Sequence, residues 1–167
     1  MPAMKSMDEL FYALLQDVYY AEKQLIKALP KLAKKSTNPE LSTAFTDHLA
    51  ETEGHVERLE AVFEAIGKRP RAKKCDAILG IIQEGKEVME EAEDETVLDA
   101  GILAAAQAAE HYEIARYGTL VAWAKELRLD DAAETLHQTL EEEKKADALL
   151  TSIAESEVNH AALKEAA

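Results

Sequence analysis

Cysteine occurs only once in the sequence, at Cys75, so the chain cannot form a disulfide within itself. No pair of cysteines, or of cysteine and histidine, stands at the spacing of a zinc site, and such a chain suits a reducing cytoplasm. Long apolar runs are also absent, because none approaches the roughly 18 residues of a membrane-spanning helix. The first five residues lack the basic and apolar regions of a secretory signal. We therefore expect a cytoplasmic protein with no membrane partner.

Basic residues are scarce relative to acidic ones. The chain has 19 lysines and arginines against 33 aspartates and glutamates, which gives a net charge of −14 at pH 7. A negative charge of this size repels nucleic acid and anionic membrane surfaces, so nucleic acid is not expected as a partner either. The chain has 167 residues, of which 47% are hydrophobic. This is enough to bury one core without disulfides.

Glycine and proline number only six and four, too few to interrupt long helices. Good helix formers are abundant, and no alternation of apolar and polar residues indicates a strand, so the fold class is predicted to be all-α. One short turn, one long connection and another short turn predict a ferritin-like four-helix bundle in a single domain spanning residues 1–167. The expected long helices cover about 7–35, 39–67, 94–127 and 130–156. A crossover helix at about 76–93 lies between the second and third of these, and a frayed tail follows at about 157–167.

Residues at the predicted helix ends support these boundaries. Ser6 with Glu9 three positions later is a capping box at the start of the first helix. Asn38 is expected to cap the second helix, which should stop at Gly67. Asp130 is expected to cap the last long helix.

Acidic residues interrupt the apolar stripes of these helices. Glu143 and Asp147 occupy core positions on the stripe of the last long helix, and Glu22 does so in the first. Glu110 and Glu113 occupy such positions in the third. Burying an unpaired carboxylate costs several kcal/mol, and neighbouring carboxylates repel one another, so the pattern requires compensating cations or protons. By contrast, the neighbours of Glu143 at positions 141 and 142 lie off the stripe and are not expected to be ligands.

The second long helix carries His48, Glu51 and His55 along one edge of its stripe, which can face the same centre. Carboxylates with one or two imidazoles suit iron or manganese, and facing helices can present their oxygens to two ions. We therefore expect two metal ions, with iron as the first choice and manganese as the alternative. Whether His48 or His55 ligates metal stays open. The candidate ligands are Glu22, Glu51, His55, Glu110, Glu113, Glu143 and Asp147.

Each acid taken singly also fits an ordinary reading, as a helix-edge residue that reaches solvent. Arg58 can pair with Glu51, and Arg116 with Glu113, as surface ion pairs on their own helices. The metal hypothesis depends on the placement of such acids on all four helices at comparable heights.

Four segments of the sequence carry a further signal: Ala21–Leu25, His48–Thr52, Ala109–Ile114 and Thr139–Lys144. Through them the chain resembles the YciE/YciF-type ferritin-like proteins of bacteria, and the resemblance extends over nearly the whole chain. The resemblance implies a stress-response protein, a homodimer and a dinuclear metal site similar to that of rubrerythrin. It also implies metal-ligand roles for the glutamates named above. Asp147 stands where rubrerythrin-like sites have histidine, and the Glu51/His55 spacing departs from the familiar Glu-x-x-His.

The first functional hypothesis is therefore a di-iron protein that reacts with oxygen or peroxide during stress, with oxidase, ferroxidase or peroxidase activity left undecided. The alternative is a non-catalytic helical stress protein whose metal is structural and which acts through its dimer surface. A storage shell ranks lower, because the fold alone does not specify the contacts of a cage. The homodimer is also favoured by aromatic residues beyond those that four inward stripes need, namely Phe11, Tyr12, Tyr20 and Trp123.

Overall fold

The computed structural model describes residues 4–165, and every regular element in that range is helical. The prediction of an all-α chain is confirmed. The tail that we expected to fray from about residue 157 is helical as far as Glu165, and its last two residues lie outside the described range. The long helices are α1 (Met7–Lys35), α2 (Pro39–Ala65), α4 (Glu95–Glu126) and α5 (Asp130–Ile153). The shorter elements are α3 (Asp76–Glu91), a π-helical turn η1 (Ala154–Val158) and α6 (Asn159–Glu165).

Three of the predicted helix ends lie where the sequence placed them. The Glu9 amide donates a hydrogen bond to Ser6 Oγ (3.2 Å) at the start of α1, and Asn38 caps α2 through its side-chain oxygen. Gly67 follows α2 with a φ of 68°. The start of α5 differs from the prediction, because Asp130 is its first helical residue and does not cap it.

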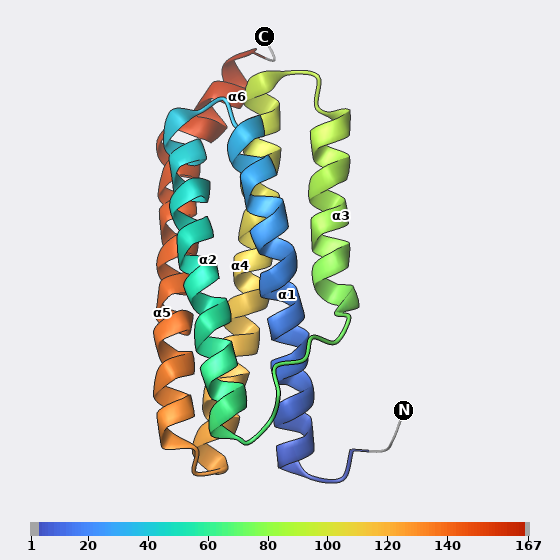
Figure 1. The fold of residues 1–167 in the computed structure, drawn as a ribbon. Coiled ribbons are helices and arrows are strands. Elements are labelled where there is room, and N and C mark those ends of the chain that lie inside the picture. The colour runs from blue at the N-terminus through green and yellow to red at the C-terminus, as the bar shows by residue number, and fades with distance from the viewer. Residues whose placement is uncertain (1–3, 166–167) are drawn as a thin grey trace.

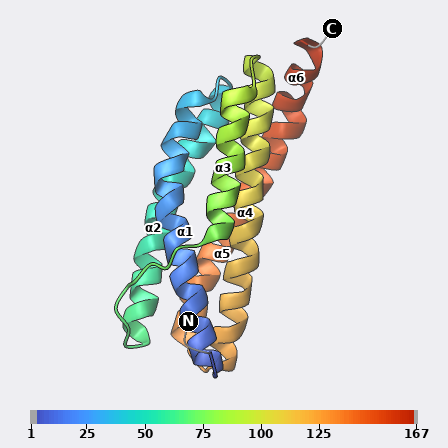
Figure 2. The same cartoon turned by 90° about the vertical axis from the view of Figure 1, so that its right-hand side faces the viewer.

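The long helices lie side by side in the order α1, α2, α5, α4 around a common axis. Figure 1 shows that α1 and α5 run in one direction, whereas α2 and α4 run in the other. Residues 66–75 lead from α2 to α3, which lies outside the four over the seam between α1 and α4 (Figure 2). No helix in the described range is long and apolar enough to span a membrane.

α3 packs closely on α4 through glycine. A Cβ atom placed on Gly101 of α4 would lie 2.3 Å from Val88 Cγ1 of α3, far inside van der Waals contact. A Cβ on Gly85 of α3 would lie 3.3 Å from Ala105 Cβ. The absence of side chains at these two positions therefore determines how closely α3 approaches α4.

The apolar core is divided into two main clusters along the length of the four helices. One cluster includes Phe11, Phe63 and Leu120, and the other includes Phe45 and Ile102. Polar residues are buried between them, on the middle turns of all four long helices. The aromatic residues that motivated the dimer prediction pack within the chain: one of them, Phe11, is 1% exposed, and the others pack against the core clusters.

Candidate metal centre

Six buried polar residues meet between the two apolar clusters, and none is more than 6% exposed. α4 presents Glu110 and Glu113 three positions apart, so both point from one face of that helix. α2 presents His48 and His55 seven positions apart, which is two turns. The six residues are Glu22 of α1, His48 and His55 of α2, Glu110 and Glu113 of α4, and Glu143 of α5.

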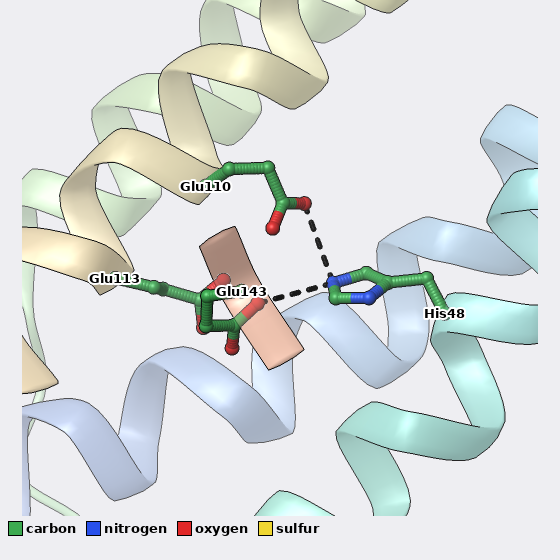
Figure 3. Close-up of side chains that lie close together, drawn as sticks. All are labelled: His48, Glu110, Glu113 and Glu143. Carbon is green, nitrogen blue, oxygen red and sulfur yellow. Dashed lines mark ion pairs between the residues drawn. The ribbon is translucent and has the colours of Figure 1, made fainter. Parts of the chain in front are cut away.

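These side chains form two groups, in each of which the ligand atoms lie within 4.8 Å of one another. The first group contains His48, Glu110, Glu113 and Glu143, and Figure 3 shows their side chains converging from different helices. The second contains Glu22, His55 and Glu143. Glu143 therefore belongs to both.

The two oxygens of Glu143 face different histidines. Its Oε2 lies 3.5 Å from His48 Nε2, and its Oε1 lies 3.0 Å from His55 Nδ1. Glu110 Oε1 is 3.3 Å from the same nitrogen of His48, and Glu22 Oε1 is 3.4 Å from the same nitrogen of His55. The carboxylate of Glu143 thus has the position of a bridge between two ligand sets.

A carboxylate also lies beside the other ring nitrogen of each histidine. His48 Nδ1 is 3.1 Å from Glu51 Oε2, and His55 Nε2 is 2.9 Å from Glu142 Oε2. Arg58 donates hydrogen bonds of 2.7 and 2.8 Å to the two oxygens of Glu142. A histidine that binds metal typically donates its second ring N–H to a carboxylate. Both imidazoles can therefore turn an unprotonated nitrogen toward the centre.

Most of the oxygen and nitrogen atoms that could bind a metal ion at the centre have no hydrogen-bond partner among the described residues. Six buried carboxylate oxygens are in this state: one each of Glu22 and Glu110, and both of Glu113 and Glu143. His55 Nδ1 also lacks hydrogen-bond geometry, although Glu143 lies close to it. An unsatisfied buried polar group costs about 1–3 kcal/mol, and native structures contain few. The centre therefore has the donor atoms of a cation site.

Burial and mutual repulsion shift the protonation of these groups. Burial raises the pKa of Glu110 and Glu113 well above the ordinary glutamate value, and neighbouring carboxylates raise it further. Burial also raises the pKa of Glu143. For His55, burial lowers the pKa, but contacts with Glu143 and Glu22 outweigh it and raise the pKa to about 11. Without metal, the centre thus retains protons in place of cations.

Tyr117 of α4 is fully buried beside the second group. Its hydroxyl donates a short hydrogen bond to Glu22 Oε1, and its ring centroid lies 6.3 Å from that of His55. Burial and the charge of Glu22 raise its pKa well above the ordinary tyrosine value. Tyr117 therefore stays protonated and holds one oxygen of Glu22 in place.

The structure brings five of the seven predicted ligands together: Glu22, His55, Glu110, Glu113 and Glu143. Glu51 and Asp147 lie outside both groups. Glu51 is exposed and lies beside the outer nitrogen of His48, whereas Asp147 lies 3.2 Å from His111 Nε2 and accepts a hydrogen bond from Gln107.

His48 lies in the first group and His55 in the second, so the structure places both histidines at the centre. Positions seven apart on a helix differ by only about 20° in direction, whereas positions four apart differ by about 40°. His48 therefore shares the direction of His55 more closely than Glu51 does. This heptad spacing was the signal in the sequence that pointed to His48.

Glu142 lies off the apolar stripe, as the sequence indicated, but it still contacts the centre. Its side chain is only 27% exposed and connects His55 to Arg58. Arg58 therefore pairs with Glu142 on α5 rather than with Glu51 on its own helix. Arg116 stacks over the ring of Tyr112 instead of pairing with Glu113.

Two cavities adjoin the first group, and both are lined by His48 and Glu110. The cavity between α2 and α5 has a volume of about 190 Å³, and both apolar residues and the charged residues Asp47, Glu51 and Lys145 line it. The other cavity lies on the opposite side of the centre, beneath α3, and its walls are mainly apolar. The centre is thus reached from two sides of different character.

Comparison with known proteins places the chain in a family. Residues 6–163 match the family described as a domain of unknown function, DUF892. Protein YciF of Escherichia coli strain K12 is 47% identical over 164 residues, which cover 98% of this chain and 99% of YciF.

Solved structures agree with this assignment. The crystal structure of the E. coli stress protein YciF matches with a TM-score of 0.90 at 48% identity, covering 93% of this chain and 99% of YciF. YcfI from Rhodopseudomonas palustris also gives 0.90, at 49% identity, covering 92% of this chain and 98% of YcfI. A Xanthomonas campestris protein at 23% identity shares the fold, with a TM-score of 0.77 over 97% of this chain and all of that one. The chain therefore belongs to the DUF892 family and is similar to the stress protein YciF, as its sequence motifs predicted.

Proposed function

We propose that this chain is a ferritin-like protein of the bacterial stress response that binds two metal ions in the buried centre, with iron as the expected ion and manganese as the alternative. In this proposal the four long helices are a ferritin-like four-helix bundle, and α3 is its crossover helix. The observation that carries the proposal is the shared position of Glu143 between two ligand groups, most of whose carboxylate oxygens lack hydrogen-bond partners among the described residues.

The donor set fits this cofactor in charge and in type. Four buried glutamates carry a formal charge of −4 when ionised, which two divalent cations neutralise. Carboxylate oxygens with one imidazole per ion suit iron or manganese better than softer metals. His48, Glu110 and Glu113 would hold one ion, Glu22 and His55 the other, and Glu143 both.

Bound iron would supply one-electron chemistry toward oxygen or peroxide. The chain's own contribution is to hold the ligands in place. Glu51 and Glu142 orient the two imidazoles, Tyr117 orients Glu22, and apolar clusters seal the centre at both ends.

Metal analysis tests the binding proposal. Protein incubated anaerobically with ferrous or manganous salt and then dialysed should retain about two ions per chain. Glu143→Gln should lower this number because it replaces the charged bridge, whereas Glu141→Gln should not, because Glu141 pairs with Lys144 away from the centre. The proposal fails if the wild type retains neither metal, or if the two variants retain equal amounts.

Reaction with oxygen or peroxide is a separate step of the proposal. We expect oxygen or peroxide to oxidise ferrous ion bound to the protein faster than the same concentration of ferrous ion free in buffer, as followed by stopped-flow absorbance. The alternative, a non-catalytic protein with a structural metal, is favoured by the description of the R. palustris relative as a candidate structural protein. Oxidation no faster than in buffer, at full metal occupancy, would support that alternative.

We also propose that the protein is a cytoplasmic homodimer, on the basis of the family resemblance. The aromatic residues that the sequence suggested for the interface pack within the core of a single chain or against it. Light scattering at micromolar concentration should give the mass of two chains. A monomer would contradict the proposal.

A further inference from the structure

The cavity beneath α3 is an apolar groove of about 180 Å³ between α1, α3 and α4. Its walls include Leu25, Ala28 and Leu29 of α1, Ile82 and Met89 of α3, and Ala106 of α4. α3 rests closely on α4 through its glycine contacts, and the α4 wall is made mainly of alanines, so a space remains between α3 and α1. Apolar cavities of about 150 Å³ are large enough to bind small hydrocarbons.

The inner end of the groove is formed by His48 and Glu110. Glu110 is 3% exposed, and its Oε2 has no hydrogen-bond partner among the described residues. The groove therefore connects the protein surface with the first ligand group. Among the residues that line it, Glu110 is the only acid.

The rest of the groove has the opposite charge. Lys27 and Lys31, one turn apart on α1, and Lys86 on α3 are exposed lining residues. None of the three forms an ion pair within the described range. Three unpaired lysines beside an apolar groove, in a chain with a net charge of −14, favour a ligand with one anionic end and one apolar end.

We propose that this groove binds a free fatty acid of medium chain length, with its carboxylate at the lysines and its alkyl chain directed toward His48 and Glu110. This binding site goes beyond the proposed metal chemistry, because neither the lysines nor the apolar walls belong to the ligand groups. It also names the class of molecule that would lie next to the centre. An alkyl chain, rather than a charged group, would occupy the space beside Glu110.

Isothermal titration with decanoate tests the ligand class, using both metal-free and manganese-loaded protein. We expect saturable binding of one decanoate per chain. Butyrate, which lacks most of the alkyl chain, and decyltrimethylammonium, which has the opposite charge, should each bind at least about tenfold more weakly. Absence of decanoate binding, or equal binding of the ammonium compound, overturns the proposal.

Matched variants test the location. Lys27→Glu with Lys31→Glu should weaken decanoate binding by about tenfold or more, whereas Lys34→Glu with Lys35→Glu, on the same helix but outside the groove, should not. Ala28→Phe should fill the groove and reduce binding, whereas Ala108→Phe, on the exposed side of α4, should not. Unchanged binding in both groove variants would show that decanoate binds elsewhere.

Metal content measured on the same samples separates this inference from the proposed function. Decanoate binding by a protein that retains no metal would uphold the groove and overturn the metal proposal. Two bound ions without decanoate binding would uphold the metal proposal and overturn the groove proposal.

Discussion

Glu51 and Glu142 each lie beside the outer ring nitrogen of one buried histidine. The hydrogen bond with His48 lowers the pKa of Glu51, so it is ionised at neutral pH and can accept the ring N–H. A carboxylate in this position fixes the orientation of the imidazole and raises its basicity as a ligand. In the proposed metal centre, these two acids would therefore affect metal affinity without contacting the ions.

Glu51→Gln should accordingly weaken metal binding by about 10- to 100-fold, the usual effect of losing such a partner, while two ions still bind at saturation. Manganese titration followed by electron paramagnetic resonance of the free ion measures both quantities. Glu53→Gln, an exposed neighbour on α2, is the control. Loss of one whole ion in Glu51→Gln would show that Glu51 is itself a ligand, as the sequence predicted.

The sequence identified most of the centre because a carboxylate on an apolar stripe is anomalous wherever the helix packs. Glu22, Glu110, Glu113 and Glu143 all carry this signal. The role of Glu142 could not be read in the same way. Its contacts with His55 and Arg58 join α2 to α5, and they depend on the relative height of two helices that are remote in sequence.

At the scale of the helices, Asp99 holds the α1–α2 turn against α4. It is 4% exposed and accepts hydrogen bonds from the amides of Thr37 and Asn38, both 2.8 Å long, and from the Thr37 hydroxyl at 2.7 Å. Asp99→Asn removes the charge and one acceptor oxygen. We expect the free energy of unfolding in urea to fall by about 2–3 kcal/mol, since hydrogen bonds to charged groups contribute about 1.5–3 kcal/mol each.

Glu134→Gln, at an exposed position on α5, removes a charge without a buried partner and should change the unfolding free energy by less than about 0.5 kcal/mol. If Asp99→Asn is equally mild, the turn is held by the packing of its neighbours rather than by Asp99.

The α3–α4 contact gives a second prediction at this scale. Gly101→Ala places a methyl group onto Val88 Cγ1, so α3 must move. We expect the free energy of unfolding to fall by about 1–3 kcal/mol and amide hydrogen exchange over α3 to become faster. Gly118→Ala is the matched control, because a Cβ there meets no atom within 4 Å. It should be neutral or stabilising by up to about 1 kcal/mol.

The double change of Gly101→Ala with Val88→Ala should recover part of the lost stability and slow the exchange of α3 again. No recovery would mean that the clash with Val88 is not the cause.

Helix ends were predictable where amino-acid type determines backbone conformation, as at Ser6, Asn38 and Gly67. The start of α5 was not, because α4 ends in a capping turn whose left-handed residue is Arg128, with a φ of 59°. The Leu129 amide donates a hydrogen bond to the Ala124 carbonyl, and both side chains belong to the apolar cluster at that end. Packing there outweighs the backbone preference of arginine, which sequence patterns do not reveal.

For the molecule as a whole, the centre is a layer of charge between two apolar clusters, and the metal-free protein must stabilise that layer with protons. The folded state raises the pKa of Glu110, Glu113 and Glu143 through burial. The pKa of His48 is also raised, because its contacts with Glu51 and Glu110 outweigh the opposing effect of burial. The pKa of His55 is raised to about 11, because its contacts with Glu143 and Glu22 outweigh the opposing effect of burial. At neutral pH the folded chain therefore binds more protons than the unfolded chain.

The sign of the pH dependence follows from this difference. A raised folded-state pKa contributes stability that is fully present below the unfolded-state value and is lost as the pH rises toward the folded-state value. The loss begins above pH 4.5 for the glutamates and above 6.5 for the histidines, and for His55 it continues to about 11. The lowered pKa values of Glu51 and Glu142 act in the opposite direction, but only below about 4.5, the ordinary value for glutamate. The Tm of the metal-free protein should therefore fall from pH 5 to pH 9.

Bound metal should reverse this trend, because cations take the place of protons that must leave before the ligands can bind. A ligand that binds only the folded state adds RT ln(1 + [L]/Kd), about 2.7 kcal/mol at a hundredfold excess over Kd. The thermal unfolding curves with chelator and with manganese, followed by circular dichroism, should thus separate increasingly from pH 5 to pH 9. Self-repulsion of the acidic surface also lowers stability at high pH, so Glu113→Gln is the control that isolates the centre. It removes one buried titrating group without changing the surface, and its metal-free Tm should fall less steeply with pH than that of the wild type. A metal-free wild type that gains stability toward pH 9, or a Glu113→Gln variant with an unchanged slope, would show that the buried acids do not control the stability of the fold.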